Sequence, residues 1–400
     1  MPKKVDPGMS VKLPVKTLKE MLKEATPFAA VKSTLPVLVN VRLAAMGDKL
    51  TIQATNLECG ISISKTATVS FEGTITIPAQ SFREMVSSLN EKDEIALEVN
   101  PKTMAMQIVS ASFKSVLKGI DAQEFPPMPT IVKTLAENVP AEALVASMMA
   151  VEYAASHENA RENLKSVFFD LGTQFINFIS TDSFRFGVHM MQFSPKEAGQ
   201  FIIPVRSVAN IARVLTGNIK IGTSANDSAL VFEGDGYMVC ASKINDNYPD
   251  WRALIKTWGE PTMTLKVTKK DVMQAIAFCD VIAQGYNHLI SLESGDGKLN
   301  LSATANELGS ANHQIDCSGN LPGKMNFNAR FLLDAINHIP DEEITIAVCN
   351  NTVLRIKGNA SKYTMHSVMA MNDGREAEEQ EKAAQAAADY KAEANGASAG

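Results

Sequence analysis

The chain repeats one pattern three times. In each copy, a strand that ends in small polar residues is followed at a nearly constant distance by a second strand that leads directly into an amphipathic helix. The distance between two landmark positions is 23, 23 and 24 residues, measured from Thr55 to Pro78, Thr181 to Pro204 and Thr304 to Asn328. Such agreement indicates an internal repeat, which constrains the fold more strongly than any single motif.

The repeat has a period of about 125 residues in a chain of 400, so each copy is long enough to bury its own core. We therefore expect three domains at residues 1–128, 129–258 and 259–372. Residues 373–400 hold seven acidic and three basic residues in an Ala/Glu-rich sequence. This composition predicts a disordered acidic tail.

A helical period opens each copy, and in the first copy it places Leu18, Met21 and Leu22 on one face. The corresponding helices are expected from Ala141 and from Lys269. Hairpin signals precede the alternating apolar runs of all three copies at Gly47-Asp48, Gly172-Thr173 and Gly295-Asp296-Gly297. The pattern predicts an α+β fold in which each domain has two helices on one side of antiparallel sheets.

Residue patterns typical of enzymes and metal sites are missing from the sequence. The six histidines form no HExxH motif or closely spaced ligand pair, and the five cysteines form no CxxC pair. Asp182 follows a strand, but Asn56 and Asn306 take its place in the other copies. This exchange favours the interpretation of Asp182 as a polar residue that closes a turn, and not as a catalytic carboxylate. The GxG runs near Glu233 and Ser294 precede strands, as hairpin turns do, rather than helices. We expect no catalytic site, no metal and no cofactor.

The composition also predicts where the protein is found. Unpaired cysteines are typical of a reducing compartment. No apolar run approaches the roughly 18 residues of a membrane helix, and the first residues lack the apolar core of a signal peptide. The expected location is the cytoplasm.

Several segments resemble a known family when they are taken in order. A first clamp domain is resembled by the segments STLPVLVNVRLAA, TIPAQSFREMVSSL and GIDAQEFPPMP. A second clamp domain is resembled by FISTDSFRFGV, FIIPVRSVANIARVL and INDNYPDWRALI. The last strand of a third is resembled by KYTMHSVMAMN. The family is that of the bacterial DNA polymerase III beta subunit, the beta sliding clamp. The resemblance covers residues 9–372 and rests on the order and spacing of loose motifs.

The resemblance implies a head-to-tail homodimer, a ring of six domains whose helices line a hole that holds duplex DNA. Such a clamp tethers a replicative polymerase and other partners, and it is placed on DNA by a clamp loader. The net charge of the chain is −6, so only the inner helices need to attract phosphates without regard to sequence. Basic candidates on these helices or on the loops before them are Lys19, Lys23, Lys32, Arg83, Arg206, Arg213, Lys269, Lys270 and Arg330.

In the family, partners insert a short peptide with a glutamine and bulky apolar residues into a pocket between the second and third domains. An apolar pocket that contains methionines can adapt to several peptides, while a few polar groups hold the peptide backbone. Carried over by position, the pocket would contain Leu164, Thr181, Ser183, Phe184, Arg185, Phe186, Pro249, Leu254, Val368, Met369 and Met371. The alternative is that Phe186, Val368 and Met369 are ordinary core residues of strands.

The sequence departs from the family at the expected pocket. Family members usually have Gly-His-Arg where this chain has Ser183 and Phe184 before its arginine, and Met-Pro-Met-Arg where it has Ala370 and Asn372 after its methionines. Ala253 replaces a residue that is commonly basic, and the chain continues for 28 residues beyond the last strand. These departures concern the preferred peptide rather than the ring. A divergent bacterial clamp and a virus-encoded clamp both fit them.

Other functions were weighed against the sliding clamp. A clamp-like interaction scaffold without a role in replication is one alternative. The two-domain clamp that closes as a trimer is another, but three repeats per chain favour a dimer of six domains. For the dimer contact we expect Phe113 on an edge strand of the first domain and Ile282 at a helix end in the third.

Overall fold

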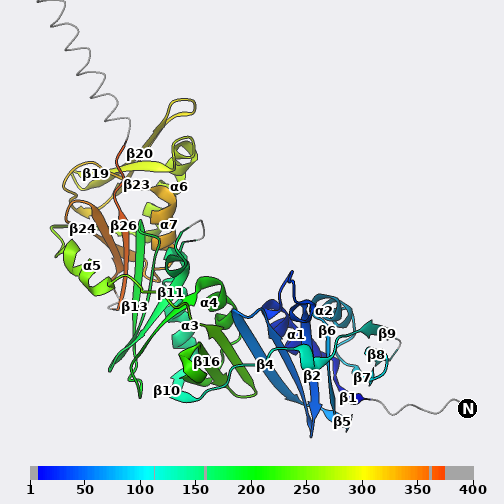
Figure 1. Ribbon diagram of the computed structural model, residues 1–400. Coiled ribbons are helices and arrows are strands. Elements are labelled where there is room, and N and C mark those ends of the chain that lie inside the picture. The colour runs from blue at the N-terminus through cyan, green and yellow to red at the C-terminus, as the bar shows by residue number, and fades with distance from the viewer. Residues whose placement is uncertain (1–7, 112, 157–159, 360–362, 374–400) are drawn as a thin grey trace, which may run out of the picture. The chain divides into compact units, whose positions relative to one another are not determined.

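The computed structural model describes residues 8–111, 113–156, 160–359 and 363–373 (Figure 1). The chain divides into two compact units. The first unit is Met1–Asp182 with Val188–Pro249, and the second is Ser183–Gly187 with Asp250–Gly400. The expected acidic tail lies outside the described residues except for Asp373. No helix among the described residues is both long and apolar enough to cross a membrane.

In the first unit, the first repeat forms a five-stranded antiparallel sheet, four strands of a larger sheet, and two helices. The five-stranded sheet has the order β5 (Thr68–Phe71), β1 (Met9–Pro14), β7 (Glu94–Asn100), β8 (Ala105–Ser110), β9 (Phe113–Lys118). The other strands have the order β6 (Gly73–Pro78), β2 (Asn40–Met46), β3 (Lys49–Thr55), β4 (Cys59–Thr66). The helices α1 (Val15–Ala25) and α2 (Ala79–Ser87) pack against each other.

The second repeat has the same plan. Four of its strands have the order β10 (Lys133–Pro140), β15 (Asn218–Thr223), β16 (Ala229–Gly234), β17 (Tyr237–Ser242). Three more have the order β14 (Gly199–Pro204), β11 (Ser166–Leu171), β12 (Phe175–Thr181), and β13 (Arg185–Gln192) begins in the second unit and ends in the first. The helices α3 (Ala141–Met149) and α4 (Val205–Ala212) again pack together.

The first two repeats share one sheet. β17 pairs antiparallel with β4, with Val239 opposite Ile61, so that the strands of both repeats form a single eight-stranded sheet. The joint is extended by a hydrogen bond from Ser242 N to Glu58 O of 2.7 Å. Because a shared sheet leaves no edge at this joint, the backbone groups of both strands are satisfied there.

The second unit contains the third repeat. One set of strands has the order β26 (Thr364–Met369), β25 (Val353–Gly358), β24 (Glu343–Cys349), β18 (Met263–Thr268), β22 (Ser318–Gly319). A four-stranded sheet has the order β21 (Gly309–Asp316), β20 (Lys298–Ala305), β19 (Leu289–Gly295), β23 (Met325–Asn328). The helices are α5 (Trp251–Trp258) and the packed pair α6 (Lys269–Ala283) and α7 (Ala329–Asn337).

Each helix of a pair begins directly after a strand. Proline occupies the N-cap position in the first two repeats, where its fixed φ suits the extended residue before a helix. Thr268 and Asn328 take this place in the third repeat. Asn328 caps α7 through its side-chain oxygen, which accepts from Arg330 N at 2.9 Å and from Phe331 N at 3.3 Å. The prolines are Pro14, Pro78, Pro140 and Pro204.

The expected helices and turns are confirmed. Leu18, Met21 and Leu22 are buried on one face of α1, and α6 spans the segment predicted from Lys269. The helix expected from Ala141 ends at Met149 and is followed by a short 3₁₀ turn, η4 (Glu152–Ala154). The predicted hairpin turns join β2 to β3, β11 to β12 and β19 to β20. Gly47 and Gly297 adopt φ values of 59° and 73° in two of them, which glycine accepts without strain.

The sequence pattern did not predict every element. Within the described residues the three repeats contain nine, eight and nine strands. α5 was not among the expected helices. Its start is nevertheless encoded locally, because Asp250 Oδ1 accepts from Arg252 N at 3.1 Å and from Ala253 N at 3.0 Å.

Candidate functional site

Most of the basic residues expected to face DNA are exposed. Of the nine candidates, seven are exposed and take part in no ion pair among the described residues. They occur in all three repeats, Lys32 in the loop after η1 (Thr26–Phe28) and the others on or next to α1, α2, α4, α6 and α7. Acidic residues share these helices, as Glu20 and Glu24 do on α1, so the helix faces carry mixed charge. The seven are Lys23, Lys32, Arg83, Arg206, Arg213, Lys270 and Arg330.

The other two candidates hold the helix pairs together. Lys19 Nζ on α1 donates to Leu89 O, just beyond the end of α2, at 2.7 Å, and lies 3.5 Å from Glu91. Lys269 Nζ at the start of α6 donates to Ile339 O, just beyond the end of α7, at 2.5 Å. An ammonium group near the C-terminal end of a helix satisfies carbonyls that lack partners and interacts favourably with the helix dipole. Through these contacts, both lysines stabilise the packing of a helix pair.

In the second unit, Phe184 and Arg185 lie against α7. The Phe184 side chain is 55% exposed, and its ring stacks on that of Phe331 with centroids 6.3 Å apart. Arg185 is buried and forms an ion pair with Asp334, and its guanidinium carbon lies 4.8 Å from the centre of the Phe331 ring. Ser183 adopts a φ of 79°, in the left-handed region. The second unit therefore presents an exposed aromatic ring beside a fixed guanidinium group.

The end of β26 lies next to this cluster. Met369 N donates to Phe184 O at 2.8 Å, and Met371 N donates to Asn326 O at 2.8 Å. Both methionines are half-buried. Val368 is fully buried, which agrees with the interpretation as a core residue of a strand. The structure thus brings the two methionines and Phe184 together within one unit.

Phe186 also lies in the second unit but faces α5. Its ring meets that of Trp258 edge-on, with centroids 5.4 Å apart, and both side chains are buried. Leu254 on the same helix is half-buried. Phe186 therefore has the burial expected of a core residue.

Sequence reasoning missed Phe331 and Asp334, although a signal was present. The corresponding positions of α2 and α4 hold Ser81 and Ser207 in place of Phe331, as the spacing from each N-cap residue shows. A bulky ring on one helix only, opposite the divergent Phe184, could have been found by comparing the copies position by position.

Three expected pocket residues belong to the first unit. Leu164 is half-buried, and its carbonyl accepts from Ser156 N at 2.8 Å. Thr181 is buried at the end of β12, and Pro249 is exposed. Before Pro249, Tyr248 stacks on Phe168 with centroids 4.7 Å apart, and burial raises the pKa of its hydroxyl. A common site of these residues with those of the second unit stays a prediction.

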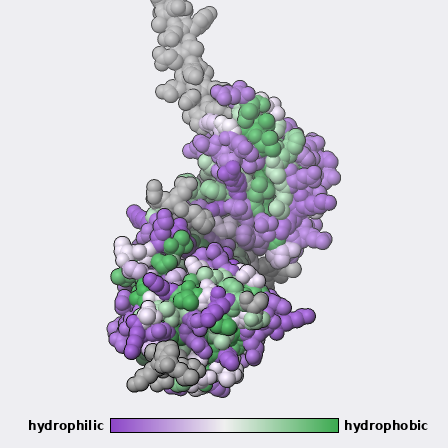
Figure 2. Space-filling view, turned by 90° about the vertical axis from the view of Figure 1, so that its right-hand side faces the viewer, coloured by the Kyte–Doolittle hydropathy of each residue, from purple (hydrophilic) through white to green (hydrophobic). Residues whose placement is uncertain are grey.

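The residues expected at a dimer contact lie near exposed apolar side chains. Phe113 is half-buried on β9, an edge strand of its sheet, and Val116 on the same strand is 56% exposed. Ile282 is half-buried on α6, where Phe278 and Val281 are 53% and 62% exposed. In the space-filling view, hydrophobic side chains form separate groups bordered by hydrophilic ones (Figure 2). Exposed apolar groups on edge elements are typical of association surfaces.

The five cysteines are free thiols, and four of them are buried. Burial raises the pKa of the Cys240 thiol to about 12 and that of Cys279 to about 11. Among the described residues, no cluster of three His, Cys, Asp or Glu side chains could hold a metal ion. Asp182, the carboxylate considered for catalysis, is half-buried beside Ser183.

Three tandem α+β domains, each with a packed helix pair and antiparallel sheets, define a clamp protein with three domains per chain. Family models of the DNA polymerase III beta subunit match the N-terminal domain at residues 9–129, the central domain at 138–250 and the C-terminal domain at 259–372. The chain therefore belongs to the DNA polymerase III beta subunit family.

Similar proteins agree with this assignment. The beta sliding clamp of Synechococcus elongatus is 26% identical over 79% of this chain and 86% of its own length. That of Staphylococcus aureus is 24% identical over 86% of this chain and 93% of its own length. The crystal structure of the DNA polymerase III subunit beta from Pseudomonas aeruginosa has a TM-score of 0.85 at 18% identity, covering 91% of this chain and all of that one. The beta subunit of Thermotoga maritima has a TM-score of 0.84 at 21% identity, with 91% and 100% covered.

Proposed function

We propose that this protein is a DNA sliding clamp, in which two chains close head to tail into a ring around duplex DNA. The ring keeps a polymerase on its template without catalysing a reaction itself. Retention by topology needs no tight contact with DNA, and weak contact allows sliding. A sliding clamp acts in the compartment that contains the DNA, and in a bacterium this compartment is the predicted cytoplasmic location. The domain boundaries at 128/129, 258/259 and 372/373 form part of this proposal.

The joint between the first two repeats carries the proposal. There, β4 of the first repeat pairs with β17 of the second. β4 is the last of the three consecutive antiparallel strands β2, β3 and β4, and β17 is the last strand of its repeat. The strand that corresponds to β4 in the third repeat is β21, and the strand that corresponds to β17 in the first repeat is β9. Both lie at the end of a sheet order among the described strands. Pairing of β21 in one chain with β9 in another would repeat the same joint, and two such joints close a ring of six domains.

The DNA contact is proposed for the exposed basic residues of the helix pairs. Lys19 and Lys269 are weaker candidates, because they are engaged within the protein. The stronger candidates are Lys23, Lys32, Arg83, Arg206, Arg213, Lys270 and Arg330. Their attraction to phosphates is independent of base sequence and weakens as salt rises. This is the kind of contact that a sliding ring needs.

For partner peptides, we propose a site that includes Phe184, Arg185, Met369 and Met371, with Leu164, Thr181, Ser183, Phe186, Pro249, Leu254 and Val368 as further members. The supporting geometry lies in the second unit, where the exposed Phe184 ring, the fixed Arg185 guanidinium and two half-buried methionines are neighbours. Apolar surface and adaptable methionines would hold bulky peptide side chains. Phe184 and Phe331 would favour an aromatic or branched apolar residue in the peptide.

The peptide site is tested by Met369→Asp with Met371→Asp. Two carboxylates in an apolar site should lower the affinity for a peptide from the C-terminal tail of the cognate polymerase by on the order of a hundredfold, since each would lose its hydration without a partner. Fluorescence anisotropy measures the affinity, and light scattering checks that the dimer is intact. Unchanged affinity would show that the peptide binds elsewhere.

A further inference from the structure

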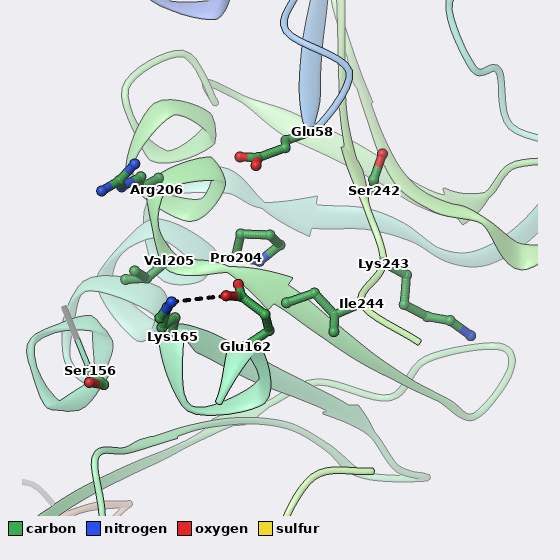
Figure 3. Close-up of a pocket in the computed structure, with 10 residues that line it drawn as sticks. All are labelled: Glu58, Ser156, Glu162, Lys165, Pro204, Val205, Arg206, Ser242, Lys243 and Ile244. Atoms are coloured by element: carbon green, nitrogen blue, oxygen red, sulfur yellow. Dashed lines mark hydrogen bonds and ion pairs between the residues drawn. The ribbon is translucent and has the colours of Figure 1, made fainter. Parts of the chain in front are cut away.

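A cavity of about 480 Å³ lies in the first unit, where the first and second repeats join. Its walls come from five places in the sequence: the β3–β4 turn, Ser156 after η4, the 3₁₀ turn η5 (Glu162–Lys165), the start of α4, and the end of β17 with the two residues after it. Figure 3 shows Pro204 near its centre, Val205 to the left, Ile244 to the right, and the Lys165–Glu162 ion pair between and below Val205 and Pro204. Arg206 and Lys243 lie at opposite sides with their charged ends directed outward, and Glu58 lies above.

The cavity lies beside α4 and the end of β17 in the same way as the Phe184 cluster lies beside α7 and the end of β26. The backbone contacts are the same in both. Ser242 N donates to Glu58 O at 2.7 Å, as Met369 N donates to Phe184 O at 2.8 Å. Ile244 N donates to Ile202 O at 2.9 Å, as Met371 N donates to Asn326 O at 2.8 Å. Corresponding residues are Glu58 and Phe184, Ser242 and Met369, Lys243 and Ala370, Ile244 and Met371, and Arg206 and Arg330.

The side chains differ where the backbones agree. Phe184 and Met369 are replaced by Glu58 and Ser242, so the cavity is more polar than its counterpart. Pro204, Val205 and Ile244 still provide an apolar floor. This combination suits a ligand that has one small apolar group and polar groups around it.

The charges of the cavity favour an anionic group on the ligand. Lys165 is paired with Glu162 at 2.8 Å, whereas Arg206 and Lys243 have no ion-pair partner among the described residues. The Nζ atom of Lys243 lies 5.9 Å from the centre of the Phe201 ring, which leaves its charge without a carboxylate. The first turn of α4 has no side-chain cap, so its N–H groups add partial positive charge at the cavity wall. Two cations on opposite sides could each meet a carboxylate. Glu58 could accept from a backbone N–H or a basic side chain.

We propose that this cavity is a second peptide-binding site, for an extended partner segment that places a small apolar side chain on the floor and an acidic side chain toward Arg206 or Lys243. The proposal rests on the proposed function only in that the counterpart in the third repeat is taken as a peptide site. A DNA backbone fits less well, because Glu58 and Glu162 repel phosphates and the apolar floor offers them nothing. A site of this kind would let one chain hold two partners with different motifs.

The test uses the full-length chain with Met369→Asp and Met371→Asp, so that the proposed site in the third repeat is blocked. A random octapeptide phage library is selected on this protein, and the enriched peptides are synthesised and measured by fluorescence anisotropy. We expect enrichment of Asp or Glu next to a small apolar residue. Adding Arg206→Glu and Lys243→Glu should then weaken binding at least tenfold. The matched control adds Lys49→Glu and Lys102→Glu, two exposed charge reversals outside the cavity, and should leave affinity unchanged.

The proposal is overturned if no peptide is enriched, if the enriched peptides lack acidic residues, or if the cavity variant binds them as well as the control does. It is also overturned if the cavity variant loses affinity for a 30-base-pair duplex but not for the peptides, which would make the cavity a DNA contact. Light scattering on both variants tests the proposed dimer separately. If the protein does not form the dimer, the control variant will be monomeric as well, and the result for the cavity is then independent of the ring.

Discussion

At the scale of residues, the divergent positions of the repeat tell more about function than the shared ones. Phe184 of the second repeat stacks on Phe331 of the third, and the residues that correspond to them in the first and second repeats are Glu58 and Ser207. Arg185 and Asp334 form their ion pair at the same place. The resemblance to the beta clamp family allowed Phe184 and Arg185 to be predicted as site residues, because they lie at positions that form the partner pocket in that family. The sequence did not reveal their partners, because contacts between residues about 150 positions apart in sequence leave no local pattern.

The first prediction concerns this ion pair. Asp334→Ala leaves the buried Arg185 guanidinium without its carboxylate, although Asp334 itself is half exposed and water can partly replace it. We expect a loss of about 1–2 kcal/mol in the free energy of unfolding, between the values for surface and buried pairs. Urea denaturation measures it. Arg185→Met combined with Asp334→Ala should cost less than the two single changes added together, and strict additivity would mean that the pair contributes nothing.

The second prediction concerns the thiols. Burial raises the pKa of all five thiols, so at pH 8 each holds less thiolate than a free cysteine does, and exposure to the reagent decides which reacts first. Cys317, which is only half-buried, should react first with a thiol reagent such as 5,5′-dithiobis(2-nitrobenzoate), and the other four should react fully only after unfolding. Cys317→Ser should remove the fast phase. Rapid reaction of all five thiols in the folded protein would contradict the burial.

At the scale of elements, the strand edges decide how the chain associates. β4 and β17 satisfy each other inside the chain, whereas β9 and β21 lie at sheet ends among the described strands. α6 packs beside β21, and Phe278 on that helix meets His313 of β21 edge-on, with ring centroids 5.5 Å apart. The repeat spacing predicted these strands, but not which of them are edges, because pairing between repeats depends on the folded chain. α5 was missed because its start depends on one capping residue, Asp250.

The third prediction tests the proposed contact between chains. Phe278→Glu with Val281→Glu places two charges on the exposed apolar face of α6. Burying these charges without partners at the contact between chains costs more than roughly 1.4 kcal/mol, the free energy that corresponds to a tenfold change in affinity. The dissociation constant of the dimer should therefore rise by well over tenfold. Sedimentation velocity measures the monomer fraction at micromolar concentration.

The control for the dimer test is Val31→Glu, which changes a valine that is 92% exposed on a loop of the first repeat. It should leave the association unchanged. A dimer that persists in the α6 variant would place the joint on other elements.

At the scale of the whole molecule, the threefold repeat accounts for the family and the proposed mechanism together. Its spacing was sufficient to predict three α+β domains, because the strand-to-helix transition at Pro78 and Pro204 is encoded locally by proline and an amphipathic run. The cavity lined by Glu58, Arg206 and Lys243 could not be foreseen, since it forms only where two repeats share a sheet. Repetition therefore predicts the architecture, and the differences between copies indicate where single sites lie.

The measurement that tests the central claim most directly compares circular with linear DNA. The labelled protein is loaded by its clamp loader onto nicked circular DNA and separated from free protein by gel filtration, and a restriction enzyme then linearises half of the sample. A ring held by topology stays on the circle and slides off the linear ends, so the labelled protein should leave only the cut DNA. Equal retention on both forms would contradict the clamp.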